Sequence, residues 1–198
     1  MFVLMNGAPY HDELKNIAAE YGNLACLEYM HEYHSLEWAP HTLLRAARNG
    51  QLSCLKFAHE NGCVLHRVHL VQAVMGGHFS CVKYCHENGV LLDSDIMGCA
   101  AFSGSVECMA YLRDKGAEWD EWVIDSAVRY GHLAALIYAH EHGCPWHRRV
   151  IWGAVVTGQK ECALYAIRNG AQMSGVDMCD NKLREWMKEE EEDTRKGR

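Results

Sequence analysis

Apolar and polar positions follow helical spacing along the chain, in a pattern that recurs about every 27 residues. In residues 52–61, Ser53, Lys56 and Glu60 fall at i, i+3 and i+7 and form one narrow polar stripe, while nearly all other positions are apolar or small. A helix with so little polar surface must be covered by neighbouring elements on several sides. The pattern therefore predicts a helix over residues 52–61 that packs among other helices.

The same segment occurs six times. Segments similar to Ala46-Ala47-Arg48-Asn49-Gly50 begin at residues 18, 46, 73, 100, 127 and 154. The fifth position is glycine in every segment, the ninth is cysteine in all but one, and the twelfth is always aromatic. Each unit is predicted to form two antiparallel helices with a turn at the fifth-position glycine. Helices of about ten residues are marginal alone, so the units must stack on one another.

These residues resemble the ankyrin repeat. The likeness rests on the segment Ala46 to Gly62 and on the Gly-His pairs Gly77-His78 and Gly131-His132, and it extends over residues 1–181. Units of the family have about 33 residues, and the residues missing here are those that form its β-hairpin. The resemblance implies an all-α, ankyrin-like helix-turn-helix repeat solenoid with little or no β-hairpin. This short variety is similar to ankyrin-like repeats of giant viruses of amoebae and of some protists.

The two ends depart from the repeat. Residues 1–17 read as a half-unit, which favours either a covered end or a truncated copy of a larger, F-box-type ankyrin adaptor. Residues 175–193 show helical spacing and are predicted to form a C-terminal capping helix, followed by a disordered tail at 194–198. Asp93, Asp120 and Ser174 occupy one column and are interpreted as helix N-caps.

Charge and cysteine content narrow the class of protein. The formal net charge is -7 and the sequence pI is about 6.0, which disfavours nucleic acid as a partner. No apolar stretch has the length of a membrane span, and no signal peptide is visible, so neither a membrane nor an export route is expected. The ten cysteines are therefore interpreted as reduced thiols, and the expected location is cytoplasmic, or the host cytoplasm if the protein is viral.

Histidine and cysteine are dense enough to raise a zinc-binding alternative. The segments 78–86 and 140–147 each carry four such side chains. Because most of these residues recur in columns, packing is the preferred interpretation, and no metal or other cofactor is expected. Trp119 and Trp146 also share an always-large column, which favours packing between units. No nucleophile with an orienting partner is recognisable, so no enzyme activity is expected.

The resemblance implies a non-catalytic scaffold or adaptor that binds a protein partner. Such stacks bind through the concave face of the first helix of each unit, and exposed Met, aromatic and Arg side chains suit an interface. The concave candidates are Arg45, Arg48, Gln72, Met75, Phe102, Arg129 and Tyr130. A second candidate is a convex apolar ridge of Ala110, Ile137 and Leu164, which also offers a route to self-association. The sequence does not identify the partner.

Overall fold

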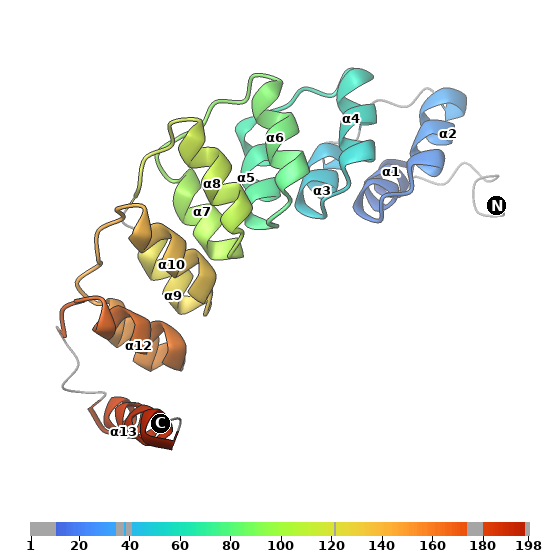
Figure 1. Ribbon diagram of the computed structural model, residues 1–198. Coiled ribbons are helices and arrows are strands. Elements are labelled where there is room, and N and C mark those ends of the chain that lie inside the picture. Colours follow the sequence, from blue (N-terminus) through green and yellow to red (C-terminus); the bar gives the residue numbers. More distant parts are fainter. Residues whose placement is uncertain (1–10, 35–37, 39–40, 121, 174–179, 197–198) are drawn as a thin grey trace. The chain divides into compact units, whose positions relative to one another are not determined.

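The computed structural model describes residues 11–34, 38, 41–120, 122–173 and 180–196, and every regular element in these ranges is a helix (Figure 1). No strand occurs within them, so the predicted all-α fold without a β-hairpin is confirmed there. None of the described helices is long and apolar enough to cross a bilayer. The chain divides into two compact units, Met1–Leu92 and Asp93–Arg198, here called the N-terminal and C-terminal units.

The N-terminal unit is a stack of three helix pairs. The first helices of the pairs pack side by side, α1 on α3 and α3 on α5, and the second helices do the same, α2 on α4 and α4 on α6. The sequence-based prediction of a helix over residues 52–61 agrees with α4 to within one residue. The bounds are α1 His11–Glu20, α2 Leu24–His34, α3 Thr42–Arg48, α4 Leu52–Glu60, α5 Arg67–Met75 and α6 Phe79–Glu87.

The C-terminal unit repeats this arrangement and adds one helix. The first helices α7, α9 and α11 pack in order, as do the second helices α8, α10 and α12, and α13 packs against α12. We call the first helices of each unit its helix-one layer and the second helices its helix-two layer. The bounds are α7 Ile96–Ser103, α8 Val106–Asp114, α9 Trp122–Arg129, α10 Leu133–Glu141, α11 Val150–Thr157, α12 Lys160–Arg168 and α13 Asp180–Lys196.

The recurrent small residues make the turn and the close packing within each pair. The fifth-position glycines adopt positive φ, for example +71° at Gly50, where an L side chain is strained. The alanines that open each segment are buried, and Ala46 and Ala47 are fully covered. Since alanine projects only a methyl group, helix one can lie close to helix two.

Asp120 ties two neighbouring helices together. Its Oδ1 accepts the backbone N–H of Trp122 at 2.7 Å, at the start of α9, and its Oδ2 accepts the N–H of Gly98 at 2.8 Å, in the first turn of α7. A Cβ on Gly98 would lie 3.0 Å from Asp120 Oδ1, so glycine leaves room for this carboxylate. The predicted capping role is confirmed for Asp120. It is wrong for Asp93, because α7 begins after Asp95, and Ser174 lies outside the described residues.

The C-terminal helix agrees with the prediction in kind and differs in extent. Leu183 is buried, and Lys182 Nζ donates to the backbone oxygen of Val155 at 3.2 Å. The helix continues to Lys196, so residues 194–196, predicted to be disordered, are helical. Glu, Lys and Arg favour helix, and residues 180–196 contain no Gly or Pro. The predicted first turn at 175–179 lies outside the described residues.

Candidate functional site

Side chains that follow the turn glycine join each repeat to the one before it. His78 Nε2 lies 3.0 Å from the backbone oxygen of Arg48, and His132 Nε2 lies 3.0 Å from that of Phe102. Each imidazole covers the turn glycine of the preceding repeat, so a Cβ on Gly50 would come within 2.6 Å of His78 Nδ1. The Gly-His pairs of the sequence are thus contacts between repeats.

Tryptophans make a second recurring contact between repeats. The indole N–H groups of Trp38, Trp119 and Trp146 donate to the backbone oxygens of Asn61, His142 and Asn169 at 2.7, 3.0 and 3.1 Å. Each acceptor is 23 residues later in the chain, near the end of the next helix two. The interpretation of Trp119 and Trp146 as packing residues agrees with these contacts. Trp38, which stands 27 residues before Leu65 in that column, was missed.

Histidines of the second helices make a third recurring contact between repeats. His59 Nδ1 lies 2.8 Å from the hydroxyl of Tyr84, and His140 Nδ1 lies 2.9 Å from that of Tyr165. His140 also stacks on Trp146, with ring centres 4.4 Å apart. These histidines therefore act in packing between successive repeats.

Burial holds several of the cysteine thiols in their protonated form. All nine cysteines that the structure describes are free, and most are buried. Burial raises the pKa of Cys81 to about 11 and that of Cys85 to about 12, which leaves little thiolate at neutral pH. No three His, Cys, Asp or Glu side chains of the described ranges converge where they could hold a metal ion. Neither His/Cys-rich segment of the zinc alternative assembles a ligand set there.

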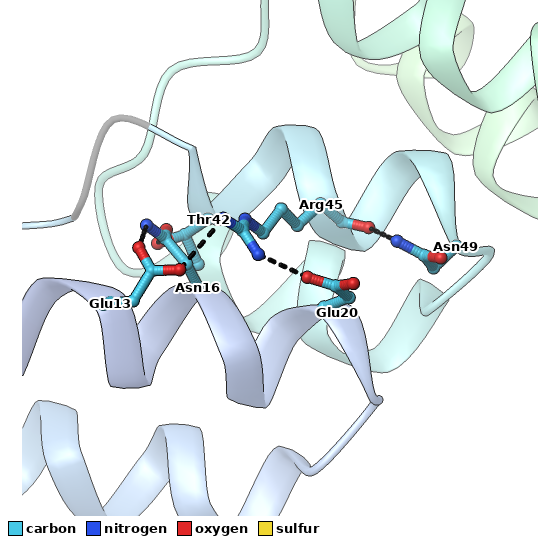
Figure 2. Close-up of polar contacts among 6 residues, drawn as sticks. All are labelled: Glu13, Asn16, Glu20, Thr42, Arg45 and Asn49. Carbon is cyan, nitrogen blue, oxygen red and sulfur yellow. Dashed lines mark hydrogen bonds and ion pairs between the residues drawn. The ribbon is translucent and has the colours of Figure 1, made fainter.

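The concave candidates of the N-terminal unit lie on α3 and α5. Arg45 is engaged within the chain, since its guanidinium forms ion pairs with Glu20 and, at 3.0 Å, with Glu13 (Figure 2). Arg48 and Met75 are exposed, and Gln72 is half-buried. Of these four residues, Arg45 is the least suited to anchor a partner, because a partner would have to replace two carboxylates.

The concave candidates of the C-terminal unit lie at the ends of α7 and α9. Phe102 and Tyr130 meet edge to face with ring centres 4.4 Å apart, and Tyr130 is 54% exposed. Arg129 is exposed and donates to Asp125 Oδ2 at 2.5 Å. The structure therefore brings two of the predicted residues, Phe102 and Tyr130, into one aromatic pair.

The convex ridge is only partly a surface, and its prediction is corrected at Leu164. Ala110 and Ile137 are half-buried, whereas Leu164 is 8% exposed and belongs to the buried set. The cause is α13, which packs on α12 through ion pairs of Lys160 with Glu189, at 2.6 Å, and of Arg168 with Glu190. Ile137, Leu164 and Glu190 line one groove beside this helix.

Sequence reasoning missed a pocket between α9 and α11. It has a volume of about 210 Å³, and its walls carry two aromatic rings, two guanidinium groups, an imidazole and a carboxylate. The lining residues are Trp122, Asp125, Arg129, His147, Arg149 and Trp152. Trp122 is seven residues before Arg129, so the two side chains lie on the same face of one helix. This spacing could have added Trp122 to the predicted contact residues.

Comparison with known proteins agrees with this architecture. Residues 43–122 match the family described as ankyrin repeats (3 copies), while no curated protein matches the sequence. The structure is similar to that of the human ASB11 ankyrin repeat domain, with a TM-score of 0.67, 21% sequence identity, and coverage of 84% of this chain and 86% of that one. Ankyrin repeats are generally non-enzymatic modules for protein–protein interaction. Residues 43–122 are thus similar to ankyrin repeats, and the fold of the chain is that of an ankyrin-repeat domain.

Proposed function

We propose that the chain is a non-catalytic scaffold or adaptor that binds a protein partner through its helix-one layers. The observation that carries the proposal is that exposed large apolar side chains lie mainly on the first helices of the repeats and in the turns that follow them. Of thirteen such residues in the described ranges, seven lie on a first helix or in the turn that follows it, and two lie on a second helix. The seven are Ile17, Tyr21, Val68, Met75, Trp122, Tyr130 and Val156.

This distribution distinguishes a recognition surface from a packing surface. Helix-two rings such as Tyr84 and Tyr165 make contacts between repeats, whereas Trp122 and Tyr130 of the helix-one side are exposed. Arg48 and Arg129 of the helix-one layers are exposed as well. Exposed aromatic, Met and Arg side chains are enriched at the centres of protein interfaces. Gathered apolar exposure on a soluble fold usually marks a contact.

Two matched substitutions test the proposal. Tyr130→Arg changes an exposed tyrosine of the helix-one side, and Tyr33→Arg changes one on helix two, where Tyr33 is 64% exposed. Proteins captured by the wild-type chain from its native cells would be identified by crosslinking and mass spectrometry. Tyr130→Arg should release the specifically captured protein, and Tyr33→Arg should retain it. Thermal unfolding of both variants controls for stability, and equal capture by the two folded variants contradicts the proposal.

Cytoplasmic location, in the host if the protein is viral, is a further part of the proposal. It is supported by the free, mostly buried thiols, which suit a reducing compartment. Alkylation of acid-quenched cell extracts should modify every cysteine without prior reduction. Thiols that react only after a reductant is added would argue for an oxidising compartment.

Self-association through the C-terminal ridge is the weaker alternative. Its support is limited to Ala110 and Ile137, because α13 covers Leu164. Sedimentation of the purified chain over a range of concentrations distinguishes this alternative, and a dimer disrupted by Ile137→Lys would favour it.

A further inference from the structure

We infer that the pocket between α9 and α11 takes an acidic segment of the partner, in which an Asp or Glu carboxylate stands beside a large apolar side chain. The inference rests on the proposed function and names the chemistry of one part of that surface. It draws on residues of the C-terminal unit alone, namely the six that line the pocket.

The charge of the pocket favours an anion. Asp125 is already engaged, because its Oδ2 accepts the Arg129 N–H at 2.5 Å and its side chain is 13% exposed. Arg149 forms no ion pair with any residue of the described ranges, and it is exposed. Within the described part of the chain, one guanidinium charge at the edge of the pocket thus has no carboxylate partner. The chain as a whole has a net charge of -7, so the positive charge at the pocket is a local feature.

A second polar group beside the pocket has no partner among the described residues. His147 Nδ1 is buried and has no hydrogen-bond partner among the described residues, although His147 lines the pocket. A buried polar atom without a partner is destabilising, so such atoms in native structures usually have one. The imidazole of His147 thus adds a second group without a described partner to the walls of the pocket.

The aromatic walls select what accompanies the carboxylate. Trp122 is 57% exposed, and the Arg149 guanidinium lies 5.9 Å from the ring centre of Trp152. At that distance the guanidinium makes a cation–π contact with Trp152, and a guanidinium can bind a carboxylate through two N–H groups at once. A volume of about 210 Å³ is below the 300–1,000 Å³ typical of small-molecule sites. It suits one or two side chains of a peptide, with the apolar one against Trp122.

Selection from a random peptide library displayed on phage tests the inference without a known partner. Peptides enriched on the wild-type chain should carry Asp or Glu next to an aromatic or aliphatic residue. The best peptide would then be titrated by tryptophan fluorescence, together with a copy in which the acid is replaced by its amide. Loss of the carboxylate, or the change Arg149→Glu in the chain, should weaken binding about ten- to a hundredfold.

Arg148 provides the matched control, because it is exposed, adjacent in sequence and absent from the pocket lining. Arg148→Glu should leave the titration nearly unchanged. Equal weakening by both charge reversals would show a diffuse electrostatic effect and would overturn the inference. Enriched peptides without acids, or no enrichment at all, would overturn it as well. Peptides released by Tyr130→Arg and insensitive to Arg149→Glu would refute this site while the proposed function stands.

Discussion

The helix-two layers of the two units contain the same contact between neighbouring repeats, whereas exposed positions of the helix-one layers differ from repeat to repeat. His59 with Tyr84 and His140 with Tyr165 have ring centres 5.6 and 5.7 Å apart and interplanar angles of 80° and 82°. On the helix-one side, equivalent positions carry Val68 in one repeat and Trp122 in another. The nearly identical geometry of these two pairs indicates that the helix-two layers use one specific side-chain contact to join neighbouring repeats.

The helix-one layer therefore has the freedom that recognition requires. Stability of a repeat stack is roughly a sum of unit terms and nearest-neighbour terms, so a layer that supplies neighbour contacts is constrained at every repeat. The first helices also pack on their neighbours, through buried side chains, so it is only their exposed side chains that can vary from one repeat to the next. The difference predicts that equal substitutions in the two layers have unequal effects on stability.

The largest expected difference separates two tryptophans. Trp146→Ala removes a hydrogen bond to Asn169, stacking on His140 and an edge contact with Tyr165, and should lower the free energy of unfolding by about 2–4 kcal/mol. Trp122→Ala removes a side chain that is 57% exposed and should change it by less than about 0.5 kcal/mol. Urea unfolding followed by circular dichroism compares them. Similar losses for both would remove the distinction between the layers.

A smaller difference concerns how the stability of the two helix-one layers depends on pH. His69 in α5 is buried, whereas the equivalent residues of the C-terminal unit are Ile96, Val123 and Val150. Burial, aided by the nearby His66, lowers the pKa of His69 to about 4. The unfolded chain binds this proton at higher pH than the folded one, so stability falls as pH drops from about 6.5 to about 4. The loss is on the order of 1–3 kcal/mol.

His69→Asn is the control for that effect. Asn does not titrate, and its side-chain oxygen can accept the His66 backbone N–H that His69 Nδ1 accepts at 2.9 Å. Urea unfolding at about pH 7 and about pH 4.5 should show a smaller loss of stability for this variant than for the wild type. Carboxylates add the same background to both proteins. Equal losses would mean that His69 titrates normally in the folded chain.

The sequence predicted what recurs and missed what depends on a single geometry. The recurring Gly and Ala positions predicted paired helices, because every repeat needs the same turn and the same close packing between its two helices. The engagement of Arg45 by Glu13 and Glu20 depends on side-chain positions that spacing does not give. Burial of Leu164 depends on where α13 docks, and that helix has no counterpart among the repeats. The pocket between α9 and α11 combines unlike residues from adjacent repeats, so no column revealed it.

The smallest expected effect tests the contact between His31 and Phe57, which lacks the hydroxyl group found in the later His–Tyr contacts. Phe57 stands where later repeats have Tyr84 and Tyr165, and its ring meets His31 at 5.7 Å and 89°, close to their geometry. His31 Nδ1 is buried without a hydrogen-bond partner in the part of the chain that the structure describes. Phe57→Tyr should place a hydroxyl beside that nitrogen and raise the free energy of unfolding by about 0.5–1.5 kcal/mol.

The gain from Phe57→Tyr must depend on the imidazole if the contact causes it. In a His31→Leu background the same change should give no stabilisation, so a double-mutant cycle measured by urea unfolding isolates the new hydrogen bond. The reverse change, Tyr165→Phe, should cost about 1–3 kcal/mol, because it leaves His140 Nδ1 without its partner at 2.9 Å. A gain that persists without His31 would mean that the hydroxyl is solvated. The recurring His–Tyr contact would then contribute ring packing alone.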